Sequence, residues 1–319
     1  MSKSVLDAKA LHDEAAAYAW VEARLWPHGP ICPHCKGTDR ISKMKGESTR
    51  IGVYKCYACR KQFSVKVGTV FEDSHVPMHH WLQAVYLMCS SKKGVSSNQL
   101  HRTLGITIKT AWFMEHRIRE AMRDGSLAPM GGAGGIVEID ETFQGNKEGV
   151  EVRRGYGHKN VILTLVERGG SARSFHVQST KKEDVLPIVR ANIKRETHVM
   201  TDEALQYNKL GRHFTKHGAV DHSREEYAYT DRVSGVTIGI NTVEGFYSIF
   251  KRGMTGVYQH CKEKHLHRYL AEFDFRYSNR VRLGIDDVQR TEIALRGVVG
   301  KRLTYRTTGR GEATEGRQA

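Results

Sequence analysis

Three carboxylates in separate segments of the chain are the residues best suited to chemistry. Asp140 ends the apolar run GGIVEID, Asp202 closes the run HVMTD, and Glu244 lies near the start of NTVEGFYSIFKRG. Two aspartates and a glutamate brought together from distant segments can hold two divalent metal ions against a phosphodiester. Such ions contact both the attacking and the leaving oxygen of an in-line displacement. These residues predict a metal-dependent site for phosphoryl transfer.

The surroundings of these carboxylates distinguish them from the other acidic residues, of which the chain has 35 in all. Asp140 follows a strand-like run, where a charge close to a core needs a partner such as a metal. Lys251 follows Glu244 by seven residues, or two helical turns, so both project from the same side of a helix. The lysine is therefore expected to hold a phosphate near the metals. The acidic neighbours that compete for these roles are Glu138, Glu141 and Glu203.

Four of the six cysteines form a second chemically distinctive pattern. Cys32 and Cys35 form one C-x-x-C pair, and Cys56 and Cys59 form another after 20 intervening residues. Two such turns present four thiolates, which complete a tetrahedral zinc site. A closed four-cysteine shell leaves no position for water, so this Zn²⁺ is expected to be structural. A redox role for the pairs is the less favoured alternative.

The segment 94–122 predicts two helices joined by a turn at Gly105. Ser96 with Gln99 forms a capping-box pattern for the first helix, and Thr107 can cap the second. A helix pair of this type places its second helix in the major groove of DNA. An ordinary helical hairpin is the alternative. The pattern therefore predicts a helix-turn-helix.

The two sides of the second helix are assigned by helical spacing. Ile108, Ala111 and Ile118 lie close to one face and are expected to pack inward. The residues expected to face outward, toward DNA, are Lys109, Thr110, Phe113 and Arg117. Arg252, next to Lys251, is a further candidate DNA contact.

The charge balance favours a polyanionic partner. Lys and Arg number 50 against 35 Asp and Glu, which gives a formal net charge of +15. Phosphates neutralised by basic residues release counterions, and this drives association with nucleic acid. A basic protein without such a partner is the alternative. A membrane partner is disfavoured because no basic amphipathic helix stands out.

The cellular location is predicted from what the sequence lacks and from its cysteines. No run approaches 18 apolar residues, and no signal-peptide pattern opens the chain. Paired cysteines with metal-ligand spacing indicate a reducing compartment. We expect a cytoplasmic protein that associates with the nucleoid when bound to DNA.

The order of predicted elements indicates an α/β fold with smaller parts attached. Two strand-like runs joined by Gly169 and Gly170 follow the run that ends at Asp140, and a helix from about Lys182 to Glu196 comes next. Three strands, a helix, a strand and a later helix match an RNase H-like core. The expected parts are an N-terminal helix (1–29), a zinc ribbon (30–72), a helix-turn-helix region (77–124), a Gly-rich linker (125–135), a catalytic domain (136–283), and a C-terminal helix with a disordered tail (284–319).

Over roughly residues 15–282 the chain resembles an IS1595-family (ISXO2-like) insertion-sequence transposase. The resemblance rests on the four-cysteine ribbon and on the motifs KTAWFMEHRIREAM, VEIDETFQGNK, TDEA and NTVEGFYSIFKRGMTGVYQHCKEKHLHRYLAEFDFRYSNR. It implies an RNase H-like catalytic domain that uses two Mg²⁺ or Mn²⁺ ions. Asp140, Asp202 and Glu244 would be its acidic triad, and Lys251 the accompanying basic residue.

Two positions depart from the family pattern. The family usually reads Gly-Gly-Lys after the first motif, where this chain has Gly145-Asn146-Lys147. Members also tend to carry His-Thr before the third block, where Gly239 and Ile240 stand here. Some members have Asn as the third acidic residue, but Glu244, unlike Asn241, has a lysine two turns downstream.

The resemblance also implies a reaction and its partners. The protein would bind the terminal inverted repeats of a mobile element, cut there, and join the ends to double-stranded target DNA. Because element ends come in pairs, a homodimer or larger homo-oligomer is expected. The alternatives are a catalytically inactive, transposase-derived DNA-binding regulator and a hydrolytic nuclease of RNase H type. The predicted DNA-binding half disfavours the nuclease.

Overall fold

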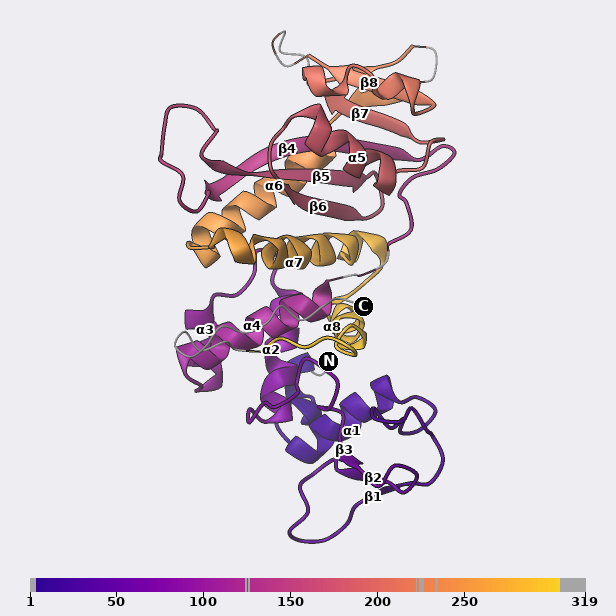
Figure 1. Ribbon diagram of the computed structural model, residues 1–319, viewed down its shortest axis with the longest axis vertical. Coiled ribbons are helices and arrows are strands. Elements are labelled where there is room, and N and C mark those ends of the chain that lie inside the picture. Colours follow the sequence, from indigo (N-terminus) through magenta and orange to yellow (C-terminus); the bar gives the residue numbers. More distant parts are fainter. Residues whose placement is uncertain are drawn as a thin grey trace.

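The computed structural model describes residues 4–304 except 124, 126, 222, 224–226 and 233–234, so the predicted disordered tail lies largely outside the described residues. The described chain is elongated (Figure 1). A small cysteine-containing sheet lies at one end, a group of helices occupies the middle, and an α/β part forms the other end.

The small sheet has three antiparallel strands in the order β1-β2-β3. These strands are β1 (Ile41–Lys43), β2 (Tyr54–Cys56) and β3 (Gln62–Phe63). Its core consists of Cys32, Cys56 and Phe63, with the rings of Trp26 and Tyr54 packed beside them. A core this small contributes little hydrophobic stabilisation, so we expect the fold of this part to depend on its metal.

The helical part combines the two ends of the described chain. It contains α1 (Glu14–Leu25), α2 (Met78–Ser90), α3 (Ser97–Leu104), α4 (Ile108–Met122) and α8 (Asp287–Arg296). Helix α8 packs against α1, α2 and α4, and its Ala294 and Leu295 join the same buried core. The segment after it continues along residues 68–70, where Val70 N donates to Val298 O at 3.1 Å.

The α/β part is built on a five-stranded sheet in the order β6-β5-β4-β7-β8. The strands are β4 (Ile136–Asn146), β5 (Lys159–Glu167), β6 (Ala172–Val177), β7 (His198–Asp202) and β8 (Lys216–Val220). Strands β4, β5 and β6 are antiparallel, whereas β7 runs parallel to both β4 and β8. The β5–β6 hairpin turns at Gly169 and Gly170 as predicted, and Gly169 has a φ of +72°, which glycine adopts without strain.

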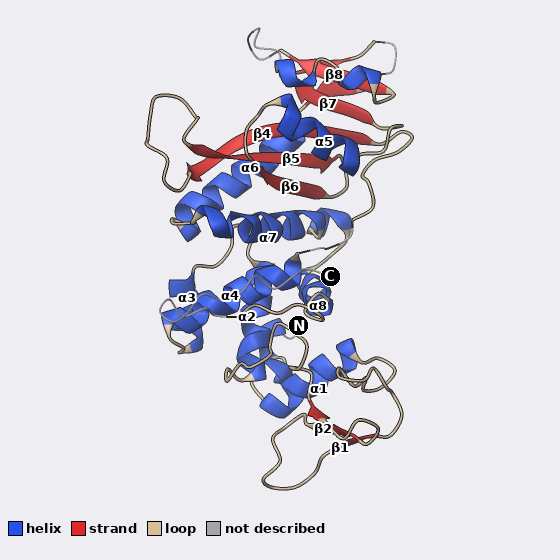
Figure 2. Cartoon of the chain, in the orientation of Figure 1, coloured by secondary structure: helices blue, strands red, loops and turns tan. Residues whose placement is uncertain are grey.

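Helices cover both faces of this sheet, which gives three layers (Figure 2). Helix α5 (Lys182–Asn192) packs on one face, where Val137 and Ile139 of β4 point. Helices α6 (Asn241–Gly253) and α7 (Leu266–Ser278) form the other apolar cluster, with Met200 and Ile162. The predicted order of three strands, a helix, a strand and a later helix is observed, and the mixed α/β fold is confirmed.

The predicted helix from Lys182 to Glu196 is too long. Helix α5 ends at Asn192, and Ile193 takes an extended conformation because it pairs with Met130 in an isolated β-bridge. This bridge anchors the Gly-rich segment before β4. Extended pairing with a residue more than 60 positions earlier in the chain is not visible in a helical pattern.

The segment 203–240 contains β8 and a short hairpin. The hairpin strands are β9 (Ala228–Thr230) and β10 (Thr237–Gly239), and β10 leads directly into α6. Short helical turns occupy η1 (Val5–Asp7), η2 (Lys9–Leu11), η3 (Leu205–Tyr207), η4 (Leu210–Arg212), η6 (Met254–Tyr258), η7 (Glu263–His265) and η8 (Val281–Leu283). Among the described residues, no helix has the length and apolar character needed to cross a bilayer.

Candidate active site

The pairing of β4 with β7 brings the two aspartates to the same level. In this parallel ladder Glu138 lies opposite Met200, and each aspartate follows two residues later on its own strand. Side chains alternate between faces, so Asp140 and Asp202 share the face on which Met200 packs with α6. Neighbouring strands lie about 4.8 Å apart. The register therefore places the aspartates side by side beneath α6.

Helix α6 brings Glu244 to the same place. Its buried side, which includes Val243 and Phe250, packs on the sheet, and the Tyr247 hydroxyl donates to Asp140 O at 2.6 Å. Glu244 precedes Tyr247 by three residues and Lys251 follows it by four, so all three lie on one side of the helix. Both Glu244 and Lys251 are exposed. The structure thus brings the three carboxylates into one region, with Lys251 two turns further along the same side of α6.

The carboxylates are close enough for their charges to affect one another. Burial raises the pKa of Asp140 to about 8, against a hydrogen bond from Glu141 N at 2.8 Å that lowers it. The negative charges of Glu141, Asp202 and Glu244 raise this pKa further. We call these four residues the acidic cluster. Its charges repel one another, and a bound cation would relieve this repulsion.

Glu141 is the member that the sequence did not select. It follows Asp140 in β4 and therefore points to the opposite face, toward Gln206 and Tyr207. Burial raises its pKa to about 7, although hydrogen bonding with Tyr207 opposes this, and the charge of Asp202 adds to the increase. Tyr207 lies in η3, after β7, so the surroundings of Glu141 depend on how this segment folds and are not visible in the spacing of the acidic residues.

The local structure around Asp202 ends β7. Its Oδ1 accepts a hydrogen bond from Ala204 N at 3.1 Å, an Asx turn that leads the chain out of the strand. Thr201, one residue earlier, points to the other face and lies 2.9 Å from His217 Nε2. Asp202 therefore stands at the carboxyl end of a parallel strand.

Glu203 and Glu138, the other two acidic residues that could take the place of a triad member, have surroundings unlike those of the acidic cluster. Glu203 is exposed. Glu138 is buried and forms an ion pair with Arg168 at 2.6 Å. Its side chain points toward the start of α6, where it accepts hydrogen bonds from Thr242 and Val243. Glu138 therefore borders the cluster as a hydrogen-bonding partner of α6.

The four cysteines fit a zinc ion. Cys32 Sγ lies 3.6 Å from Cys59 Sγ, and Cys35 Sγ lies 3.7 Å from Cys56 Sγ. Tetrahedral zinc with Zn–S bonds of about 2.3 Å requires sulfur atoms roughly 3.8 Å apart. Backbone N–H groups of Cys59 and Ala58 lower the pKa of the Cys56 thiol to about 7, which favours the thiolate. These features support a structural zinc ion.

The acidic cluster is wider than the cysteine site. In the described part of the chain, the cysteines alone bring three or more potential ligand atoms from His, Cys, Asp or Glu all within 4.8 Å of one another. The carboxylates therefore do not form a cage for one ion. Two ions about 3.5–4 Å apart need ligands spread over a wider space, and carboxylate oxygens suit Mg²⁺ and Mn²⁺.

Helices α3 and α4 form the predicted pair around Gly105, which has a φ of +64°. Ser96 Oγ accepts from Gln99 N, and Thr107 Oγ1 accepts from Thr110 N, both at 3.2 Å, so the predicted helix starts are confirmed. The prediction that Ile108 packs inward is wrong. It is the first residue of α4 and remains 49 % exposed, because the buried side of α4 begins one turn later at Ala111.

The predicted outward orientation of Arg117 is also wrong. Arg117 is buried, and its Nη1 donates to Val70 O at 2.8 Å and to Glu72 O at 2.7 Å. Its Nε donates to Leu303 O at 3.1 Å. Two distant segments cover this side of α4. Lys109 is exposed, while Thr110 and Phe113 are partly buried, and with Arg117 and residues 73–76 they line a cavity of about 260 Å³.

The remaining candidate DNA contact, Arg252, lies at the end of α6. It is exposed and donates from Nε to Ser248 O at 2.9 Å and from Nη2 to Ser248 Oγ at 2.5 Å. Lys251 is its neighbour, so the last turn of α6 presents two basic residues at the surface. This turn lies two helical turns from Glu244.

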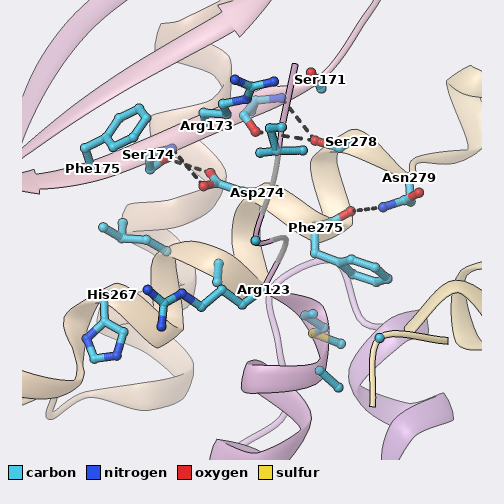
Figure 3. A pocket seen from close by; sticks show the side chains of 18 of the residues that line it. Arg123, Ser171, Arg173, Ser174, Phe175, His267, Asp274, Phe275, Ser278 and Asn279 are labelled. Atoms are coloured by element: carbon cyan, nitrogen blue, oxygen red, sulfur yellow. Dashed lines mark hydrogen bonds between the residues drawn. The ribbon is translucent and has the colours of Figure 1, made fainter. Parts of the chain in front are cut away.

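A larger cavity, about 1160 Å³, lies elsewhere, between the helical part and the edge strand β6 (Figure 3). Its lining includes Arg123 of the segment after α4, Arg173 of β6, and His267 and Asp274 of α7. No residue of the acidic cluster lines it. Asp274 and Ser278 instead bind the backbone of β6, with Ser174 N to Asp274 Oδ2 at 2.7 Å and Ala172 N to Ser278 Oγ at 3.1 Å.

Comparison with known families gives the class of protein. Residues 132–278 match the ISXO2-like transposase domain, and residues 12–62 match the transposase zinc-ribbon domain. Both families are parts of transposases of the IS1595 type. Both matches are to the IS1595 (ISXO2-like) transposases, which confirms the resemblance seen in the sequence.

A curated relative is consistent with this assignment. The chain is 27 % identical over 271 residues to an uncharacterized protein in transposable element ISH50 of Halobacterium salinarum. The match covers 79 % of this chain and 86 % of the relative. It extends beyond either matched domain, so the similarity includes the helices between them.

Proposed function

We propose that the protein is a DDE-type DNA transposase whose acidic triad is Asp140, Asp202 and Glu244. The observation that carries this proposal is the β4–β7 register, which puts both aspartates on the face covered by the helix of Glu244. The sheet order and the helices on both faces support an RNase H-like core. The family assignment supports transposition as the reaction.

The three carboxylates would hold two Mg²⁺ or Mn²⁺ ions, which when bound stabilise charge on the attacking and leaving oxygens. Tyr247 fixes the second turn of α6 to β4, which keeps Glu244 beside Asp140. Lys251 is placed to contact a phosphate two turns along the same side. Positioning and charge neutralisation of this kind supply most of the catalysis in phosphoryl transfer.

The N-terminal parts would bind the terminal inverted repeats. The zinc ribbon and the α3–α4 pair offer basic and helical surfaces for this, and Lys109, Thr110 and Phe113 of α4 remain candidate contacts. Arg252 would contact DNA near the acidic cluster. Arg117 is withdrawn as a contact because it is buried against backbone carbonyls. Two element ends require two active sites, so a dimer or larger assembly on DNA is part of the proposal.

A strand-transfer assay on labelled end DNA with Mg²⁺ or Mn²⁺ tests the proposal. The wild type is expected to give cleaved and joined products, and Asp202→Asn is expected to bind the same DNA without cutting it. Cleavage without joining would indicate a nuclease. Binding without cleavage by either protein would indicate a DNA-binding regulator.

A further inference from the structure

Helix α6 lacks a cap from its own segment. The first N–H groups of a helix have no partner within the helix, and a polar residue just before it usually accepts from them. Here that position is Ile240, whose apolar side chain is buried. The acceptor comes from β4 instead. Glu138 Oε2 accepts from Thr242 N at 2.7 Å and from Val243 N at 2.9 Å.

The other oxygen of Glu138 is also engaged. Its Oε1 accepts from Thr242 Oγ1 at 2.8 Å and from Arg168 Nε at 2.6 Å. An ionised carboxylate offers about four lone-pair sites, and these four donors use them all. Glu138 therefore has no capacity left for a metal ion, although it lies two residues from Asp140 on the same face.

Arg168 extends this contact to the segment that enters α6. Its two Nη atoms donate to Thr237 O at 2.6 Å and to Gly239 O at 2.9 Å, both in β10. One ion pair, between the buried Glu138 and the partly exposed Arg168, thus fixes the last strand before α6 and the first turn of α6 to β4. Glu244 follows Val243 directly, so its backbone position is set by this contact.

From these contacts we infer that Glu138, held by Arg168, is a positioning residue that locates Glu244 relative to Asp140. The inference rests on the proposed function, because it gives Glu244 a role in the reaction. The strand that carries Asp140 also fixes the helical turn that carries Glu244. A displacement of about 1 Å in a reacting group can slow catalysis roughly 100-fold.

The variant Glu138→Gln tests this inference. Glutamine removes the charge and turns an N–H donor toward other donors, so the start of α6 should loosen. Hydrogen exchange of the metal-free protein is expected to accelerate in peptides covering residues 238–246. At saturating end DNA, the kcat of cleavage should fall about 10- to 100-fold. The affinity for end DNA should not change, because the proposed end-binding surfaces lie in other parts of the chain.

Two further variants make the result specific. Thr242→Val removes one donor to Oε1 and keeps both backbone donors, so it should give a smaller change in the same direction. If Glu138→Gln does not fold, Thr242→Val alone tests whether Glu138 positions Glu244. The matched control is Glu292→Gln, which breaks an ion pair with Arg24 of 2.5 Å between α1 and α8 and should leave kcat unchanged.

The possible outcomes separate this inference from the proposed function. Unchanged kcat in Glu138→Gln, with an active wild type, would overturn the positioning role. An equal loss of kcat in Glu292→Gln would show a general effect of destabilisation and would overturn it as well. A wild type that does not cleave would overturn the proposed function, and faster exchange would then leave Glu138 as a helix cap only.

Discussion

At the scale of single residues, neighbouring acidic side chains have different surroundings. Glu138 and Asp140 lie on the same face of β4, yet Glu138 is saturated by four donors while Asp140 faces other carboxylates. Glu141 points the other way and still lies within the field of Asp202. Identity and spacing alone do not distinguish them. The donors that surround each carboxylate do.

Arg117 gives a prediction at this scale. Replacing it with Met should leave three backbone carbonyls without their donors, each at a cost of about 1–3 kcal/mol if it stays buried. The thermal midpoint should fall, while the affinity of the folded protein for end DNA should change little. Thermal unfolding and DNA titration of the same preparation would measure both. A loss of affinity at unchanged thermal midpoint would restore Arg117 as a DNA contact.

The sequence predicted which residues share an element better than it predicted what packs against them. The i, i+7 spacing of Glu244 and Lys251 was sufficient because both lie on one helix. Arg117 was misplaced because the backbone that covers it comes from Val70, Glu72 and Leu303, far away in the sequence. A helical pattern shows which side chains share a face, and it does not show what packs there.

At the scale of elements, α7 completes the edge of the sheet. Strand β6 is an edge strand, whose outward N–H groups would otherwise be open to pairing with another strand. Asp274 and Ser278, one turn apart on α7, accept from Ser174 N and Ala172 N, two residues apart on β6. One turn of a helix and two residues of a strand span similar lengths, so the single helix α7 can accept hydrogen bonds from both N–H groups of β6. A helical pattern in the sequence does not reveal this edge contact, because the contact depends on the order of the strands.

Asp274 gives a prediction about pH. Burial raises the pKa of Asp274 to about 7, against the opposing effects of its hydrogen bonds with Ser174 and of Arg173. A carboxyl group whose pKa is raised by folding stabilises the folded state at low pH, and this contribution is lost as pH rises through about 7. Thermal midpoints measured from pH 4 to 8 should therefore fall more steeply in the wild type than in Asp274→Asn. Asparagine can keep both contacts to Ser174. Parallel curves for the two proteins would contradict the prediction.

At the scale of the whole molecule, a buried ionic network joins the helical part to the α/β part. Arg119 of α4 lies 2.7 Å from Glu272 of α7, and both side chains are fully buried. Arg276 and the hydroxyl of Tyr258 contact the same carboxylate. Breaking a buried pair leaves an uncompensated charge. The orientation of α4 relative to the sheet therefore depends on Glu272.

Replacing Glu272 with Gln tests this dependence. Two buried arginines would lose the charge of Glu272, at a cost of about 3–5 kcal/mol, although Arg119 would keep Glu115 at 3.6 Å. Calorimetry should show a lower midpoint, with separate transitions if the two parts uncouple. Because the network lies apart from the acidic cluster, the folded variant should still cleave end DNA at low temperature. A midpoint within one degree of the wild type would contradict the prediction.

The return of the chain to the helical part has a consequence for synthesis. Helix α8 and the residues that pair with 68–70 leave the ribosome after the whole α/β part. The helical unit that carries α3 and α4 cannot assemble its full core until then. A polypeptide released before α8 is made would contain the acidic cluster but not the complete core of the helical unit that carries α3 and α4. Under the proposed function, the parts that bind element ends would therefore complete their fold after the acidic cluster has formed.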